Sequence, residues 1–186
     1  YVFLLGSAHD YILEIPRPLY EVHIFEFGVH LFERLQAKAL LISGTHPAAN
    51  LDQSADLVQQ ANKQNLFNLT AQVLLREAGP RPMTILHLRG FGYREEAPPP
   101  ESDLLMAFKS GLGTRKNVGL QGQRILDVLE SEGLQVRFVD GQKDVTGYEV
   151  GGLPQADYLE QTVNKRFALL WLSPLARGAY RQQEEN

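Results

Sequence analysis

The amino-acid sequence predicts an α/β protein, a three-layer sandwich built on a mixed, mainly parallel sheet. Short apolar runs typical of buried strands alternate with segments of helical period through most of the chain. This alternation favours parallel pairing, because each helix returns the chain to the same end of the sheet. The length of 186 residues is enough for one full hydrophobic core, and we do not expect a second. The sequence therefore predicts a single domain over residues 1–186.

The first predicted elements are two strands and a helix. The strands are the apolar runs Val2–Leu5 and Tyr11–Ile15, which a polar, turn-like gap separates. Pro16-Arg17-Pro18 ends the second strand, because proline has no N–H to donate to a sheet. Helical period follows from Glu21 to Leu35, and Glu21 lies where a carboxylate favours the positive end of the helix dipole. The predicted apolar stripe of this helix is Val22, Phe25, Val29, Phe32 and Leu35.

The later elements continue the alternation of strands and helices. The predicted strands are Ala39–Ile42, Met83–Leu88, Leu104–Phe108, Val136–Val139 and Phe167–Leu172. The predicted helices are Asn62–Glu77, with Asn62 as N-cap and Leu66, Leu69, Val73 and Leu74 apolar, and Asn117–Glu132, with Val118, Ile125, Leu126 and Leu129 apolar. Residues 93–103 and 142–155 are predicted loops, and one helical turn is expected over residues 175–180.

Composition narrows the classes of function. Apolar residues make up 44% of the chain and charged residues 22%, which is typical of a soluble globular protein. The net charge of −4 removes the general electrostatic reason to expect a nucleic-acid partner, and no apolar run is long enough to insert into a membrane. The chain has no cysteine, so any metal ion must be held by histidines and carboxylates. We expect a soluble cytoplasmic or periplasmic domain, and the abrupt strand-like start favours excision from a longer chain with other domains.

The most informative stretch follows the predicted strand Ala39–Ile42. The apolar run stops at a Ser-Gly pair, and His46, Asn50, Asp52 and Asp56 come next without helical or strand period. In open α/β sheets, ligands bind outside the carboxyl ends of the strands, so these residues are candidates for a functional site. The alternative is a polar loop whose Asp and Asn side chains cap the next helix.

Three polar groups are expected at one edge of the parallel sheet: Arg17 with Glu21, His46 with Asp52 and Asp56, and His87 with Arg89. Histidines and carboxylates there could hold a zinc ion with an open position for water, as hydrolytic zinc sites do. Two of these residues also have a structural interpretation. Glu21 suits the start of a helix, and His87 suits a hydrogen-bonded place within an apolar strand. His46 is the stronger candidate ligand, because it follows a strand end and a loop follows it.

The order of features resembles the group of N-formylglutamate amidohydrolases and poly-gamma-glutamate hydrolases, whose fold is similar to that of zinc carboxypeptidases. The matching stretches are Leu13–Glu21, His87 on an inner strand, and Leu170–Ser173 followed by Arg177. By this resemblance, Glu21 and His87 would be metal ligands. Members usually have a histidine shortly before the glutamate, where this chain has Arg17, and a late-strand glutamate that activates water, where it has Trp171. An arginine cannot ligate a cation, and an indole cannot act as a base.

Two explanations follow from these departures. In the first, His46 supplies the missing ligand, and Asp56 or Glu14 supplies the base. In the second, the chemistry is lost and the cleft still binds a ligand. Arg17 and Arg89 would then replace the positive charge of the metal toward a carboxylate or an anionic sugar.

The favoured function is metal-dependent hydrolysis of an amide bond in a small-molecule or peptide-like substrate that bears a carboxylate, with zinc as the cofactor. The assigned residues are Glu21, His46 and His87 as zinc ligands, Asp56 and Arg89 for catalysis, and Arg17, Asn50 and Arg177 for substrate binding. The rival is a catalytically inactive hydrolase-like domain that binds an anionic ligand or a protein partner. A third interpretation is a scaffold whose partners dock through the loop at Pro98.

Overall fold

A seven-stranded sheet forms the centre of the fold in the computed structural model, which describes residues 1–4, 9–92, 101–109, 118–140, 145, 147–159 and 164–179. Its strands are β1 (Val2–Leu4), β2 (His9–Ile15), β3 (Ala37–Ile42), β4 (Met83–Gly90), β5 (Leu104–Phe108), β6 (Val136–Phe138) and β7 (Lys165–Leu172). They lie in the order β1-β3-β2-β4-β7-β5-β6. Each strand that the sequence predicts is present, with ends that differ by one or two residues where the chain is described.

The four central strands run parallel to one another. β3, β2, β4 and β7 pair in this way, while β1 is antiparallel to β3, and β5 is antiparallel to β7 and parallel to β6. The prediction of a mixed, mainly parallel sheet is confirmed. The carboxyl ends of the four parallel strands consequently meet at one edge. Their register places Glu14 beside His87 and Arg89 beside Trp171.

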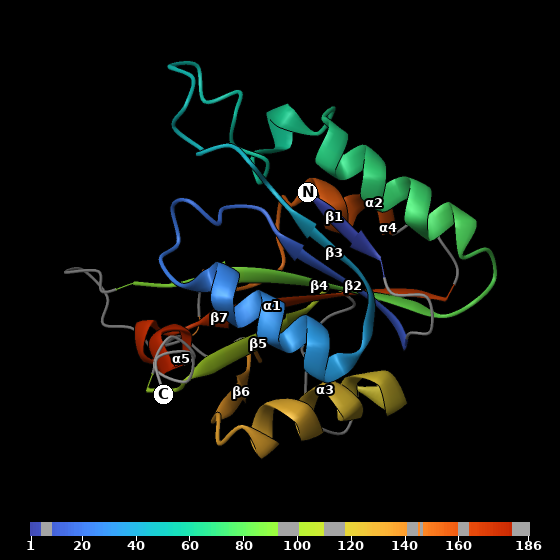
Figure 1. Cartoon of the computed structure of the whole chain (residues 1–186), viewed down its shortest axis with the longest axis vertical. Coiled ribbons are helices and arrows are strands. Elements are labelled where there is room, and N and C mark those ends of the chain that lie inside the picture. The colour runs from blue at the N-terminus through green and yellow to red at the C-terminus, as the bar shows by residue number, and fades with distance from the viewer. Residues whose placement is uncertain are drawn as a thin grey trace.

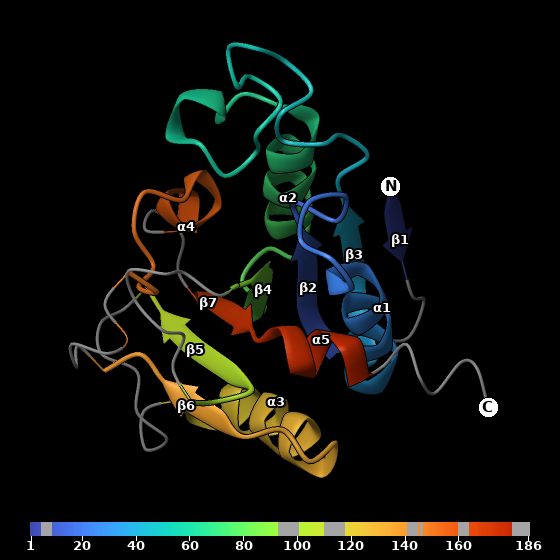
Figure 2. The same ribbon diagram turned by 90° about the vertical axis from the view of Figure 1, so that its left-hand side faces the viewer.

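Helices cover both faces of the sheet (Figures 1 and 2). On one face lie α1 (Ile24–Leu35), α3 (Gly119–Ser131) and α5 (Pro174–Ala179). On the other face lie α2 (Leu66–Glu77) and α4 (Pro154–Leu159), over a second apolar layer. The three-layer α/β sandwich is therefore confirmed. The loop over residues 43–65 joins β3 to α2, includes the 3₁₀ turn η1 (Gln60–Asn62), and projects next to α2 at the top of Figure 2.

Helix α1 begins at Ile24 and not at Glu21, and its buried face matches the predicted stripe only in part, at Phe32 and Leu35. His23 precedes the helix in a left-handed conformation, with φ 62°, so Glu21 lies in the turn before it. Val22 and Phe25 of the predicted stripe are 65% and 45% exposed. The buried face consists of Ile24, Phe27, Gly28, Leu31, Phe32 and Leu35. Helical period could not select this face, because apolar residues occur on both sides of the helix.

Helix α2 also differs from the prediction at its start and in its buried face. Its N-cap is Asn65, whose Oδ1 accepts the N–H of Asn68 at 2.8 Å. The predicted cap, Asn62, instead donates to two backbone carbonyls of the preceding loop. The buried residues are Asn68, Ala71 and Leu75, while the predicted apolar residues Leu66, Leu69 and Val73 are exposed. The N-cap residue determines where a helix begins, and the N-cap Asn65 lies three residues after the predicted one, Asn62.

Helix α3 matches the prediction, and helix α4 was not predicted. Val118, which directly precedes α3, and the three other predicted apolar residues of that helix are all buried. Helix α4 begins at Pro154, at the end of a predicted loop; proline is favoured there because the first helical N–H has no intrahelical partner. Six residues are too few to show a helical period. The Pro98 loop and residues 110–114 lie outside the described residues, and no helix within the described residues is long and apolar enough to cross a membrane.

Candidate functional site

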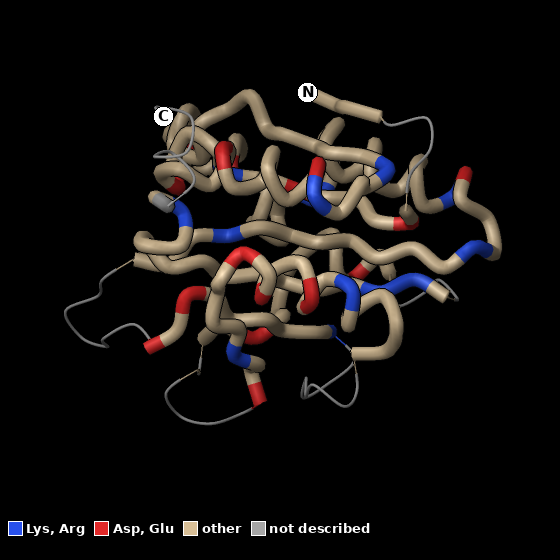
Figure 3. Tube along the Cα trace, turned by 60° about the horizontal axis from the view of Figure 1, so that its bottom comes forward, with Lys and Arg blue, Asp and Glu red and all other residues tan. Residues whose placement is uncertain are grey.

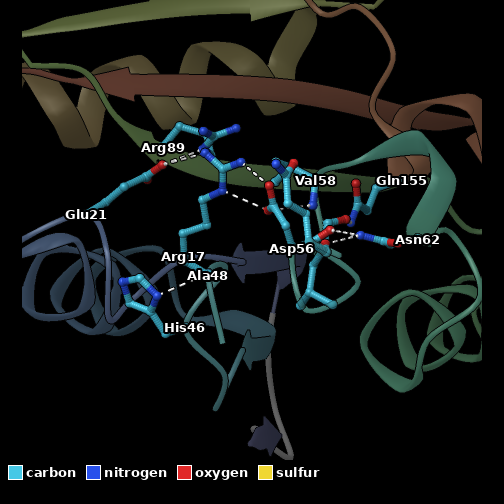
Figure 4. Close-up of polar contacts among 11 residues, drawn as sticks. Arg17, Glu21, His46, Ala48, Asp56, Val58, Asn62, Arg89 and Gln155 are labelled. Carbon is cyan, nitrogen blue, oxygen red and sulfur yellow. Dashed lines mark hydrogen bonds and ion pairs between the residues drawn. The ribbon is translucent and has the colours of Figure 1, made fainter. Parts of the chain in front are cut away.

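Five charged side chains gather beyond the carboxyl ends of β2 and β4. They are Arg17, Glu21, Asp56, Arg89 and Arg177, and we call them the arginine–carboxylate cluster. Arg17 and Glu21 come from the turn after β2, Asp56 from the loop over residues 43–65, and Arg89 from β4 (Figure 4). Their convergence follows from the parallel sheet, which brings the ends of neighbouring strands to one edge.

Glu21 and Arg89 form the most buried ion pair of the cluster. The two oxygens of Glu21 accept hydrogen bonds from the Nε of Arg89 and the backbone N–H of Gly90, each at 2.7 Å. Glu21 is 5% exposed and Arg89 is 7% exposed. The guanidinium of Arg89 also lies over the indole of Trp171, with Cζ 4.7 Å from the ring centroid. Arg89 is therefore held by a carboxylate and an aromatic ring at once.

Arg17 and Asp56 form a second, bidentate ion pair. The Nε and Nη2 of Arg17 donate to the two carboxylate oxygens of Asp56, at 2.9 and 2.5 Å. The backbone carbonyl of Asp56 accepts a further hydrogen bond from Asn62 at 2.9 Å. Burial raises the pKa of Asp56, but the hydrogen bonds and the charge of Arg17 lower it by more, so its pKa lies below the ordinary value.

Arg177 binds the backbone at three places. Its Nη1, Nη2 and Nε donate to the carbonyls of Val22, Phe91 and Ser173, at 2.6, 2.9 and 3.4 Å. A Cβ added at Gly90 would lie 2.7 Å from this guanidinium, so the close approach requires glycine. Arg177 thus holds chain segments together at the site edge, and its predicted contact with a substrate stays a prediction.

The cluster carries a net positive charge, because its three guanidinium groups face two carboxylates. Figure 3 shows acidic and basic positions interspersed over the fold, so this balance is a local property of the site. Burial lowers the pKa of Arg89, while the charge of Glu21 opposes this effect, and an arginine side chain stays protonated in proteins. In the described part of the chain, the Nη1 and Nη2 of Arg89 have no hydrogen-bond partner, and neither is a buried atom.

Glu14 and His87 form a separate pair inside the core. Each is 0% exposed, and the Nδ1 of His87 lies 2.7 Å from Oε2 of Glu14. The other polar atoms of the two side chains, Oε1 of Glu14 and Nε2 of His87, have no partner among the described residues. The ring of His87 packs against Phe167, with centroids 5.5 Å apart. This is the hydrogen-bonded core histidine that the sequence offered as its structural alternative.

The polar residues of the loop after β3 bond mainly within that loop. The Nδ1 of His46 accepts the N–H of Ala48 at 3.1 Å, and Figure 4 shows His46 apart from the Arg17–Asp56 pair. Asn50 donates to the hydroxyl of Ser54 at 2.8 Å, and Asp52 accepts the backbone N–H of the same residue at 3.0 Å. These two side chains order the loop itself and do not cap the next helix. Asp56 is the loop residue that reaches the cluster.

The predicted zinc ligands do not fit a metal ion as they are arranged. No group of three or more histidine, cysteine or acidic side chains that could hold a metal occurs in the described residues. Glu21 uses both oxygens on Arg89 and Gly90, His87 is enclosed with Glu14, and His46 lies elsewhere in the loop. The assignment of Glu21, His46 and His87 as ligands stays a prediction that metal analysis tests.

Two features of the site were not identified from the sequence. One is the backbone N–H of Gly90, which carries no side-chain signal. The other is the stacking of Arg89 on Trp171, which requires knowing that β4 pairs with β7 in this register. A signal for Arg89 existed, since a charged residue departs from the apolar pattern near the carboxyl end of its strand.

Comparison with known proteins supports the fold class. No family model matches the chain, and no curated protein has significant sequence similarity to it. A bacteriophage poly-gamma-glutamate hydrolase matches in structure with a TM-score of 0.53 and 14% identity, over 95% of this chain and 72% of that one. YndL, described as zinc-free, matches with a TM-score of 0.50 and 12% identity, over 96% of this chain and 74% of the other. At such identities the likeness shows the fold alone: the chain has an α/β, hydrolase-like fold.

Proposed function

We propose that this hydrolase-like domain binds a carboxylate-bearing ligand at the arginine–carboxylate cluster, without a metal ion. The observation that carries the proposal is Arg89, a buried arginine with two outer nitrogens that lack a partner among the described residues. These two nitrogens are not buried atoms, so an anion can reach them, and its oxygens would accept charge-assisted hydrogen bonds from both. The net positive charge of the cluster favours an anion over a neutral ligand.

The location of the cluster supports the same function. It lies beyond the carboxyl ends of parallel strands, where α/β proteins bind ligands. The loop over residues 43–65 contributes Asp56 to the edge of the cluster, and the turn after β2 contributes two further charges. Two segments remote in sequence thus form one charged surface next to a rigid strand.

The test is thermal unfolding with propionate as the probe, at constant ionic strength set with sodium chloride. A ligand that binds only the folded state raises the melting temperature in a concentration-dependent way. We expect propionate to raise the melting temperature of the wild type and to have a smaller effect on Arg89→Gln. Arg34→Gln is the matched control, because the half-exposed Arg34 pairs with Glu132, which directly follows α3. Equal melting temperatures in propionate and in chloride would overturn the proposal.

A second candidate is metal-dependent hydrolysis of an amide bond, with Glu21, His46 and His87 as zinc ligands and Asp56 assisting. The observation that favours it is the structural likeness to a poly-gamma-glutamate hydrolase and to a protein described as zinc-free. It requires Glu21 to release Arg89 and Gly90. Metal content of protein purified without chelator tests it. Stoichiometric zinc that is lost in both His46→Ala and His87→Ala supports this candidate, and a metal-free wild type rejects it.

A further inference from the structure

We infer that the ligand carboxylate binds the outer edge of Arg89, and that Trp171 is the positioning residue that orients this guanidinium. Arg17, in this assignment, is a structural residue that holds the loop over residues 43–65. The inference rests on the proposed function and deepens it, because it divides two roles between two arginines that look equivalent in the sequence. It also restricts the ligand group to a monoanionic carboxylate.

Arg17 has one paired edge occupied by Asp56, and Glu21 lies beside the other. Two of its three nitrogens donate to the two oxygens of Asp56. Its third nitrogen, Nη1, lies 4.0 Å from Oε1 of Glu21. Bidentate recognition of a carboxylate needs two adjacent N–H groups on one side of the guanidinium. An external carboxylate at this edge would have to displace Asp56, which Asn62 holds in place. At the Nη1–Nη2 edge of Arg17 it would meet the like charge of Glu21.

Arg89 binds its carboxylate partner differently. Among the described residues, its Nε is the nitrogen that hydrogen-bonds, to Glu21. The edge formed by Nη1 and Nη2 has no partner in the described residues, and it presents two parallel N–H groups. These match the two oxygens of a planar carboxylate. Lysine could not replace this geometry, because its ammonium is a point charge.

Trp171 keeps that edge in one orientation. Its indole lies against the guanidinium of Arg89 at 4.7 Å, and both residues are anchored in paired strands. The indole is itself fixed, because its Nε1 donates to the carbonyl of Tyr148 at 3.1 Å and its ring contacts the ring of that residue edge-on, with centroids 5.5 Å apart. The pairing with Glu21 alone would allow rotation about the side-chain bonds of Arg89. The aromatic ring removes this freedom before a ligand arrives, which lowers the entropic cost of binding.

The charge of the cluster selects the class of anion. Three guanidinium groups and two carboxylates leave one net positive charge, which a single carboxylate neutralises. A phosphate dianion would leave an excess negative charge beside the buried carboxylates of Glu21 and Asp56. We therefore expect propionate to bind more tightly than inorganic phosphate.

The experiment uses the fluorescence of Trp171, because the chain contains one tryptophan. Propionate is titrated at constant ionic strength, and its dissociation constant is taken from the change in emission. We expect a saturable change in the wild type, a dissociation constant about tenfold higher in Arg89→Lys, and a smaller effect in Arg17→Lys. Loss in Arg17→Lys with retention in Arg89→Lys would overturn the inference, as would phosphate binding more tightly than propionate.

Variants of Trp171 separate positioning from a general effect on folding. Calorimetric titration of propionate replaces fluorescence here. Trp171→Phe retains an aromatic face for the guanidinium, whereas Trp171→Leu does not, and we expect the second to weaken binding about fivefold relative to the first. A merely structural role would lower the melting temperatures of these variants while leaving their dissociation constants equal.

The failure of this inference can be distinguished from the failure of the proposed function. If propionate does not raise the melting temperature of the wild type, both are overturned. If it does so with a smaller effect on Arg89→Gln, but the emission of Trp171 does not change and Trp171→Leu binds propionate as tightly as Trp171→Phe, the cluster binds a carboxylate without positioning by Trp171. Only the present inference is then overturned.

Discussion

Asp56 joins the loop over residues 43–65 to the turn after β2. Its carboxylate accepts two hydrogen bonds from Arg17, and its backbone carbonyl accepts one from Asn62. Asp56 is 5% exposed, so solvent screens its interaction with Arg17 less than it screens a surface ion pair. A single residue therefore fixes both the arginine and the loop.

The first prediction concerns the pH dependence of stability. The folded-state pKa of Asp56 lies below its unfolded-state value, so the ionised carboxylate stabilises the fold at neutral pH. This contribution is lost as the pH falls through the folded-state pKa, below about pH 4. We expect Asp56→Asn to lower the free energy of unfolding at pH 7 by about 1–3 kcal/mol. On acidification, the free energy of unfolding should fall less in this variant than in the wild type. Urea unfolding at several pH values measures both effects, and a pH-independent difference would contradict the assignment.

The second prediction concerns the buried pair of Glu14 and His87. Both side chains are 0% exposed, so removing one leaves the other without its partner in an apolar core. We expect His87→Leu to cost about 3–5 kcal/mol, and the double variant Glu14→Leu/His87→Leu to recover most of this loss. Glu14→Gln is the milder control, because an amide oxygen can still accept from Nδ1 of His87. Urea unfolding of the wild type, Glu14→Leu, His87→Leu and the double variant gives the coupling energy. Additive costs would show that the two side chains act independently.

At the scale of the element, the packing of α1 against the sheet depends on Gly28. A Cβ at this position would overlap the Cδ1 of Ile15 and lie 3.1 Å from Cδ1 of Leu88. The helix thus approaches β2 and β4 more closely than any residue with a side chain would permit. This close approach selects the buried face of the helix, which explains why Phe25 points to solvent.

The third prediction follows from this approach. Gly28→Ala should lower the free energy of unfolding by about 1–3 kcal/mol, because a methyl group overpacks the interface. Adding Ile15→Val should recover part of the loss, since it removes the overlapping Cδ1 atom. Gly44→Ala is the control, because an added Cβ there meets nothing within 4 Å. If Gly28→Ala were as stable as the control, another feature would have to set the face of α1.

The elements also show what the sequence could and could not predict. Strands and helix α3 were predictable, because apolar runs and one clear apolar stripe leave little choice. The faces of α1 and α2 were not, since both helices carry apolar residues on the side that solvent reaches. Their starts depend on local geometry, the left-handed His23 and the cap Asn65. The helical period of apolar residues specifies neither the buried face nor the first residue of these helices.

For the candidate site, the sequence predicted which edge of the sheet carries the charged residues better than it predicted which of them pair. The rule for strand ends brought Arg17, Glu21, Asp56 and Arg89 to one edge, and the structure places them there. It could not predict that Arg17 binds Asp56 while Glu21 binds Arg89. That choice depends on how the turn after β2 and the loop over residues 43–65 fold back onto β4.

At the scale of the whole molecule, the carboxyl edge of the sheet is held together by Arg177. Its guanidinium binds Val22 before α1, Phe91 after β4 and Ser173 before α5. These three segments are far apart in sequence. Two of these hydrogen bonds, to Phe91 and Ser173, are buried, so loss of the guanidinium would leave buried carbonyls without this donor.

The last prediction tests this arrangement with a double-mutant cycle. Arg177→Ala should lower the free energy of global unfolding by about 2–4 kcal/mol, because three carbonyls lose a charged donor. Gly90→Ala should also destabilise the wild type, by about 1–3 kcal/mol, because the new methyl group displaces the guanidinium of Arg177. When Arg177 is already alanine, the methyl group displaces nothing, and Gly90→Ala should cost less.

Urea unfolding of the wild type, the two single variants and the double variant measures this coupling. Gly92→Ala is the matched control, since a Cβ at Gly92 meets nothing within 4 Å. Strictly additive losses at Gly90 and Arg177 would show that the strain at Gly90 is relieved elsewhere, and that the edge of the sheet is not held by this arginine. A sub-additive result would show that Gly90 and Arg177 are energetically coupled. Their packing would then stabilise the edge of the sheet beside the cluster.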